Sequence, residues 1–190
     1  DPVENASLVP WMTLTASAHV MLIYSHRQKA LLSTFILSIL TFFFILYSTF
    51  LTRSGILGDS SVHAFTDLGM TGQLVIYMIF FLVFALVLLF VNRKALNEHT
   101  EEEHISSREF WMFIGTLVLV IGCLQITFTT STPVINKIFG TKLAPPVDPI
   151  DHYNQWQVPV AIFLCLLIGV GQFFRYKKTE WQTFKKKISL

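Results

Sequence analysis

The chain has 190 residues, of which 53% are hydrophobic and only 14% are charged, with a net charge of +2 and a mean hydropathy of +0.57. Because an average soluble domain is about a quarter charged, this composition excludes a soluble domain. It also excludes a disordered chain, a collagen, a basic nucleic-acid-binding domain and a disulfide-stapled miniprotein. The remaining class is an all-α, polytopic integral membrane protein.

Five apolar stretches follow one another, each near the ~20 residues that a helix needs to cross ~30 Å of hydrocarbon. They are residues 8–24, 30–51, 72–92, 111–129 and 158–174. Because a segment in lipid must satisfy its own backbone donors and acceptors, we expect helices rather than strands. Residues 1–190 are therefore predicted to form one membrane-spanning unit. No signal peptide precedes Asp1, and we expect the chain to be a piece of a longer one.

Basic residues are unevenly distributed among the segments between these stretches. Segments 25–29, 93–109 and 175–190 hold 11 of the 14 lysines and arginines. Segments 52–71 and 130–157 hold only three. The positive-inside rule places the first set in the cytoplasm, and the other two loops and the Asp1 end on the outer face. The basic tail after residue 174 is interpreted as a topology anchor, with lipid-specific recognition as the alternative.

Cys123 and Cys165 both fall inside apolar stretches, and the chain has no CxxC and no zinc-ligand spacing. We interpret both as small buried hydrophobic residues rather than as a redox pair.

His19 lies eleven residues into the first apolar stretch, about 16 Å along a helix and close to the expected midplane of the bilayer. A titratable ring at this depth needs a partner. The alternatives are a packing contact with a neighbouring helix, a proton relay and an axial haem ligand.

His63 lies in the outer loop 52–71, at or just above the expected membrane surface, where it is either solvated or a ligand. Arg53, at the start of that loop, either pairs with a carboxylate such as a haem propionate or faces a lipid headgroup. The remaining histidines are His26, His99, His104 and His152. We interpret the first three as solvated. His26 lies in the short basic segment 25–29, and His99 and His104 diverge by about 140° on a helix, so they cannot share a metal ion on one face. His152 lies beside interfacial aromatic residues.

Four segments of the chain carry a resemblance to a known family. They are DPVENASLVPW at 1–11, TASAHV at 15–20, STFLTRSGIL at 48–57 and SVHAF at 61–65. Together they resemble the CcmF/NrfE type of haem-handling proteins of cytochrome c maturation, in which DPVENASxxPW follows a tryptophan-rich motif. The strong match covers about residues 1–65.

The resemblance implies roles for five residues. His19 corresponds to a histidine that ligates a haem b inside the membrane bundle, and His63 to one of two outer histidines that ligate the haem being attached. Asp1 corresponds to the acidic end of the tryptophan-rich platform under that haem. Trp11 continues the signature, and Arg53 falls in the RSG stretch.

The implied function is that of a haem lyase subunit in cytochrome c-type biogenesis in a bacterial inner membrane. It presents haem to the CxxCH cysteines of apocytochrome c, while a buried haem b passes an electron from quinol to the haem iron. The implied partners are a haem chaperone, apocytochrome c and its thiol-reducing proteins, with no nucleic acid. The partner ligands of His19 and His63 match no motif in this chain.

Two other functions stay open. One is a haem exporter or presenter without ligase activity. The other is a proton- or quinone-coupled transporter subunit in which His19 is a relay. TRSGIL together with SVHAF favours the haem lyase subunit.

Overall fold

The computed structural model describes residues 1–58, 60–66, 69–96 and 104–188. Within these residues the chain is all-helical and has no strand. The helices are α1 (Pro2–Arg27), α2 (Leu31–Arg53), α3 (Thr71–Val91), α4 (Arg108–Thr130), α5 (Thr132–Phe139), α6 (Pro149–Gly171) and α7 (Trp181–Ile188). Five of them, α1 to α4 and α6, are long and apolar enough to cross a membrane. The all-α, polytopic fold with five spanning helices is confirmed.

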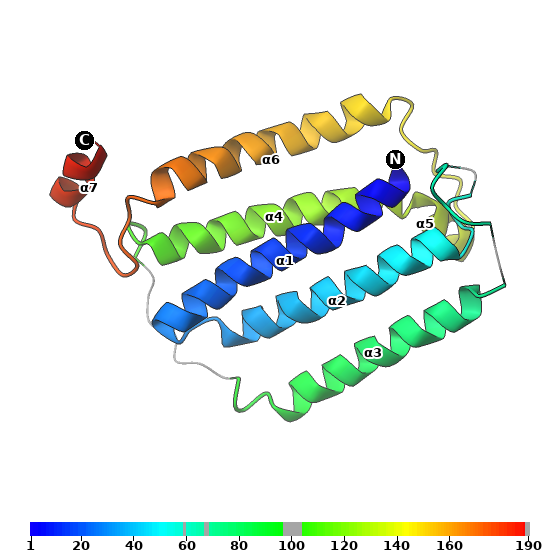
Figure 1. The fold of residues 1–190 in the computed structure, drawn as a ribbon, viewed down its shortest axis with the longest axis horizontal. Helices are drawn as coiled ribbons and strands as arrows, with labels where there is room; N and C mark the ends of the chain where they lie inside the picture. The colour runs from blue at the N-terminus through cyan, green and yellow to red at the C-terminus, as the bar shows by residue number, and fades with distance from the viewer. Residues whose placement is uncertain (59, 67–68, 97–103, 189–190) are drawn as a thin grey trace.

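The long helices lie side by side in the order α6, α4, α1, α2, α3, and sequential helices run in opposite directions along the row (Figure 1). The bundle therefore has two ends. The Asp1 end holds the start of α1, the residues that follow α2, and α5 (Figure 1). The α7 end holds the turn between α1 and α2, the start of α4 and the C-terminal helix (Figure 1).

Two spanning helices start earlier than their apolar stretches indicate. α1 begins at Pro2 rather than near residue 8, because the Asp1 carboxylate caps it by accepting a hydrogen bond from the Val3 amide at 2.9 Å. α6 begins at Pro149 rather than near residue 158, capped in the same way by Asp148. The polar first turns of α6 hid it from a hydropathy analysis. The segment 130–157, expected as a loop, also contains α5.

The earlier start of α1 changes the depth expected for His19. His19 lies about 26 Å along the helix axis from Pro2 and about 12 Å from Arg27. It therefore lies on the α7 side of the middle of α1, rather than near the midpoint that the sequence predicted.

α1 is the central helix and packs between α2 and α4. Its buried residues recur at alternating intervals of three and four, which is the seam of a helix packed along its length. The residues in this pattern are Ala6, Val9, Thr13, Ala16, Val20 and Ile23, and Met12 and Ser17 are buried beside them. Several are small, and small side chains let helices approach closely in lipid, where apolar surface alone gives no preference for protein over acyl chains.

Polar side chains add specific links across these seams. The Ser17 and Ser38 hydroxyls of α1 and α2 lie 2.9 Å apart. Arg27 Nε of α1 donates to Glu109 Oε2 of α4 at 2.8 Å, and the Glu109 side chain is only 3% exposed. A buried carboxylate requires such a partner, so this pair fixes the α7 end of α1 against α4.

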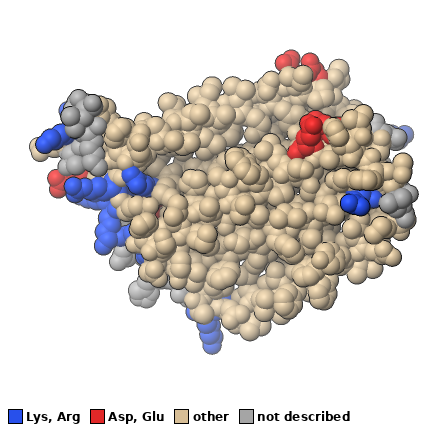
Figure 2. All heavy atoms as spheres, in the orientation of Figure 1, with Lys and Arg blue, Asp and Glu red and all other residues tan. Residues whose placement is uncertain are grey.

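The outer helices α3 and α6 are exposed along their length. α3 and α6 contain no buried residue, although α3 is the most apolar helix of the chain. Figure 2 shows the charged side chains of this face gathered toward the two ends of the bundle, with an uncharged band between them. This is the surface of a helical bundle immersed in hydrocarbon.

The central packing of α1 predicts a contrast between two alanines of the same helix. Ala16 is fully buried, whereas Ala18 is exposed. Ala16→Leu overfills the α1 seam and should lower the free energy of unfolding by about 1–3 kcal/mol. Ala18→Leu adds the same volume toward lipid and should change it by less than about 0.5 kcal/mol. Thermal unfolding in detergent measures both, and equal effects would refute the assignment of α1 as the central helix.

Candidate functional site

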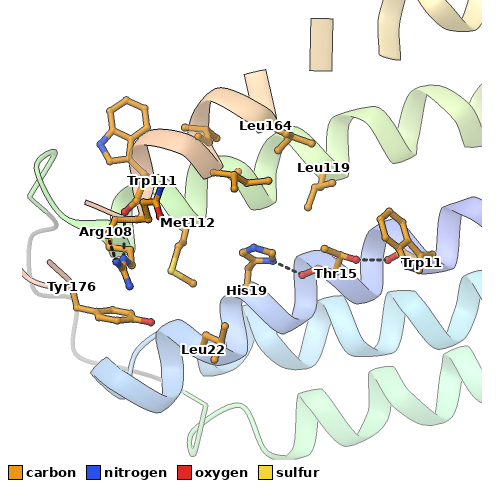
Figure 3. A pocket seen from close by; sticks show the side chains of 15 residues that line it. Trp11, Thr15, His19, Leu22, Arg108, Trp111, Met112, Leu119, Leu164 and Tyr176 are labelled. Carbon is orange, nitrogen blue, oxygen red and sulfur yellow. Dashed lines mark hydrogen bonds between the residues drawn. The ribbon is translucent and has the colours of Figure 1, made fainter. Parts of the chain in front are cut away.

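A cavity of about 460 Å³ lies between α1, α4 and α6 in the half of the bundle nearer the α7 end. Most of its lining is apolar, with Leu22, Leu119, Leu164 and Leu167 among the walls. Figure 3 shows side chains of all three helices converging on it. Its volume and character are those of a site for a small, largely apolar ligand.

His19 is the imidazole of this cavity, and its ring points into the open space (Figure 3). Its Nδ1 lies 2.8 Å from the Thr15 carbonyl oxygen. A carbonyl oxygen only accepts, so Nδ1 is the donor, and in the neutral ring Nε2 carries the lone pair. Metal-binding histidines are commonly oriented in this way, with one nitrogen held by a carbonyl and the other directed at the metal.

Arg108 lies at the α7 end of the cavity, at the first residue of α4. Its Nε donates to the Gly171 carbonyl at 3.3 Å and its Nη2 donates to the Gln172 carbonyl, so the guanidinium caps the end of α6. Tyr176 packs 5.3 Å from the guanidinium carbon. Because a guanidinium has five N–H donors, Arg108 keeps donors for an anionic group at this end of the cavity.

A second cluster lies at the Asp1 end and is built on His63. The His63 Nδ1 lies 3.5 Å from Asp1 Oδ2, and the His63 side chain is 56% exposed. Ser61 donates its hydroxyl to Asp1 Oδ1 at 2.6 Å and accepts the His63 backbone amide at 3.1 Å. A carboxylate facing Nδ1 leaves Nε2 available to a ligand, which is the carboxylate–histidine arrangement of many metal sites.

Arg53 ends α2 on the same side of the bundle. Its guanidinium carbon lies 4.8 Å from the centre of the Phe65 ring, and the Phe65 amide donates to the Thr52 carbonyl at 3.0 Å. The segment after His63 is thereby held against the end of α2. Arg53, Asp1 and His63 therefore belong to one end of the molecule, although their positions in the sequence are far apart.

The structure divides the five sequence-predicted residues between two clusters. Asp1, Arg53 and His63 lie at the Asp1 end, whereas Trp11 lines the cavity together with His19. Trp11 is about 15 Å from Asp1 along α1. The cavity is also lined by residues that the sequence patterns did not predict, namely Arg108, Met112, Trp111 and Tyr176. The α1 side of the cavity has a sequence signal, because its residues Trp11, Thr15, His19 and Leu22 recur at intervals of four, four and three and so share one helix face.

His152 takes part in a polar cluster between α4 and α6. Its Nε2 lies 3.1 Å from the Thr129 hydroxyl and 3.4 Å from Gln125 Nε2. Gln157 Nε2 donates to Gln125 Oε1 at 2.7 Å and to the Gly122 carbonyl at 3.2 Å. Gly122 permits this approach, because a Cβ there would lie 3.2 Å from the Gln157 side-chain oxygen. The cluster joins α4 to α6 in the half of the bundle nearer the Asp1 end, whereas Arg108 joins them at the other end.

The cysteines and the remaining histidines add no site within the described residues. Cys123 is buried in α4, but Cys165 is exposed on α6, so its predicted burial is wrong: that face of α6 is turned outward. In the part of the chain that the structure describes, no three His, Cys, Asp or Glu side chains gather in a way that could hold a metal ion. His99 lies outside the described residues.

Comparisons with known proteins identify relatives along nearly the whole chain. It is 31% identical over 183 residues to the cytochrome c-type biogenesis protein CycK of Bradyrhizobium diazoefficiens, covering 95% of this chain and 27% of that protein. It is 32% identical over 182 residues to CcmF of Pseudomonas fluorescens, covering 94% and 26%. It is 30% identical over 183 residues to the probable cytochrome c-type biogenesis protein NrfE of Escherichia coli, covering 95% and 32%.

The similarity extends well beyond residues 1–65, which carry the motif resemblance. The chain spans about a quarter to a third of the length of these curated relatives. No family model matches the chain. No solved structure matches it.

The polar cluster predicts a stability difference between two glutamines of α6. Gln157→Leu removes the hydrogen bonds to Gln125 and to Gly122, and should lower the free energy of unfolding by about 0.6–1.7 kcal/mol, as measured for hydrogen bonds between membrane helices. Gln155 is exposed, and Gln155→Leu is the matched control. Thermal unfolding in detergent compares the two variants. An unchanged midpoint for Gln157→Leu would show that the cluster does not hold α6 on α4.

Proposed function

Because the chain is a homologue of the CcmF/NrfE-type cytochrome c-type biogenesis proteins over nearly its whole length, we propose that it acts in cytochrome c-type biogenesis as the haem-handling part of a haem lyase. The observation that carries the proposal is a pair of histidines, His19 on α1 and His63 in the segment after α2, each with Nδ1 facing an oxygen and Nε2 left for iron. The substrate is haem, and the acceptor is the CxxCH motif of apocytochrome c.

The Asp1 end is the proposed site of the substrate haem. His63 is an exposed axial ligand that the Asp1 carboxylate orients through Nδ1. Arg53 supplies a cation for a propionate, and Phe65 beneath it supplies apolar surface. These groups match the two parts of haem, which has an apolar macrocycle and two carboxylates. At this end the haem is open to a thiol that approaches from outside the bundle.

The attachment is an addition reaction in which all atoms of the thiol and the vinyl group are kept. Each cysteine thiol adds across one vinyl group, so that a sulfur–carbon bond forms, the thiol hydrogen goes to the other vinyl carbon, and no net oxidation occurs. The role of His63 and Asp1 is then to hold the macrocycle at the surface with its vinyl groups accessible. Positioning of this kind converts a reaction between two proteins into one between prealigned groups.

The residues of the inner cavity fit a resident haem b. His19 would hold the iron through Nε2, the leucines would provide an apolar wall, and Arg108 would provide donors for a propionate at the α7 end. A haem b at this position would supply one-electron chemistry, with quinol as the electron source. The contribution of the chain is to fix the His19 tautomer through the Thr15 carbonyl and to exclude water with the leucine walls.

The proposed location is a bacterial inner membrane, with the Asp1 end outside and the α7 end in the cytoplasm. The basic residues support this orientation, because segments 25–29, 104–108 and 175–188 meet at the α7 end. The proposed partners are a haem chaperone, apocytochrome c and the proteins that keep its thiols reduced. Binding of haem without formation of c-type cytochrome would favour a haem presenter instead.

Replacing His19 tests the inner site. In protein purified from membranes, His19→Ala should reduce the haem b absorbance at least about tenfold. Loss of a residue that only orients a metal ligand already weakens metal binding by about 10–100-fold, and this variant removes the ligand itself. Added imidazole should restore part of the absorbance, since free imidazole can occupy the space left by the His19 ring and bind the iron in its place. His104→Ala, a surface change, is the control. An unchanged spectrum in His19→Ala would refute the inner site.

Replacing Asp1 tests the outer site without removing its ligand. Asp1→Asn keeps a side-chain oxygen to cap α1 but removes the charge that faces His63 Nδ1. It should weaken binding of haem at this end by about 10-fold and lower c-type cytochrome formation, while His63→Ala should abolish both. Haem-stained gels of cytochrome c measure the second effect. Wild-type levels in both variants would exclude this end as the substrate site.

A further inference from the structure

The C-terminal helix α7 carries both apolar and basic side chains, and its role is not part of the proposed function. Its apolar residues Trp181, Phe184 and Ile188 recur at intervals of three and four, so they share one face. Lys185 and Lys186 are exposed beside that face. A short helix with an apolar face and a basic one is typical of segments that lie in the plane of a membrane surface.

A row of stacked rings attaches α7 to the bundle. Phe184 lies 4.9 Å from Phe174, and Phe174 lies 6.4 Å from Trp111 of α4, in each case with nearly parallel rings. Trp181 stacks on Phe184 at 5.6 Å and remains 65% exposed. The stacked rings thus fix α7 at the end of the bundle, and the exposed Trp181 indole is available for contact with lipid.

The segment between α6 and α7 is also held in place. The Thr179 amide donates to the Ser106 carbonyl at 3.0 Å, and the Arg108 amide donates to the Arg175 carbonyl at 2.8 Å. Thr179 is buried, and its hydroxyl accepts from the Arg175 amide at 2.7 Å. α7 therefore has a defined position relative to the start of α4.

Charge in the segment that contains α7 is mostly positive. Residues 175–187 contain six lysines and arginines and one acidic residue, Glu180. Lys177, Lys178 and Lys185 are all exposed. Figure 2 shows basic side chains gathered at this end of the molecule. Such a cluster at the end of a spanning helix is attracted to phosphate-bearing lipids of negative charge.

We propose that α7 and the segment before it bind anionic phospholipid headgroups at the membrane surface. Trp181 and Ile188 lie at the boundary between headgroups and acyl chains, and Lys177, Lys178 and Lys185 contact the phosphates. The bound lipid fixes α7 over the end of the bundle, next to Arg108 and Tyr176 at the rim of the inner cavity. This inference is independent of haem.

Hydrogen exchange of α7 in nanodiscs tests the proposal. The full chain is reconstituted in phosphatidylcholine alone and in a 7:3 mixture, by design about a third anionic, of phosphatidylcholine and phosphatidylglycerol. Exchange of the amides of 181–188 should be at least about tenfold slower in the anionic discs, because each lysine near such a surface strengthens binding by about fivefold. High salt should remove most of the difference, since exposed charges are then screened.

The triple variant Lys177→Gln, Lys178→Gln, Lys185→Gln should lose the difference between the two lipids. The control Lys137→Gln, Lys142→Gln removes positive charge at the Asp1 end and should keep it. Exchange in α1 and α4 reports whether each variant is folded. If the triple variant is unfolded, the salt dependence of exchange in the unaltered chain tests the proposal instead. Equal exchange of α7 in both lipids, as expected if a protein partner covers it instead, would overturn the proposal.

Discussion

The structure depends on one constraint, which is that helices in lipid must find one another without a hydrophobic driving force between them. In this chain the solution is α1, whose seam of small and β-branched residues packs against α2 on one side and α4 on the other. The Arg27–Glu109 pair and the Ser17–Ser38 contact fix the register of these seams. α3 and α6 attach to this core from outside and contain no buried residue.

The same helix positions both candidate sites. Asp1 caps α1 and faces His63 at one end, and His19 enters the cavity nearer the other end. A straight helix holds Asp1 and His19 about 27 Å apart. Substrate haem at a surface and a resident haem inside the bundle would therefore have a fixed separation, set by backbone hydrogen bonds rather than by flexible segments. This arrangement explains why the family motifs are concentrated in residues 1–20, since α1 carries residues of both candidate sites.

Much of this could be predicted from the sequence, for reasons that differ between features. The five spans follow from hydropathy because lipid allows few alternatives to a helix. The starts of α1 and α6 could not be found in that way, because Asp1, Pro2, Asp148 and Pro149 act through capping, which hydropathy does not measure. The Asp1–His63 contact joins residues 62 positions apart and depends on the fold of the segment after α2. Arg108 has the sequence appearance of a solvated loop residue, and only the packing of α6 on α4 places it at the cavity.

Direct imaging of iron tests the central claim, which is that Nε2 of His19 and Nε2 of His63 are both ligands of haem. A cryo-electron microscopy map of the protein from its native membranes, at a resolution that shows side chains, locates each porphyrin relative to α1. We predict one porphyrin in the cavity between α1, α4 and α6 with its iron bonded to His19, and one at the Asp1 end with its iron bonded to His63. A map with porphyrin elsewhere, or with acyl chains filling the inner cavity and none bound to either histidine, would contradict the account.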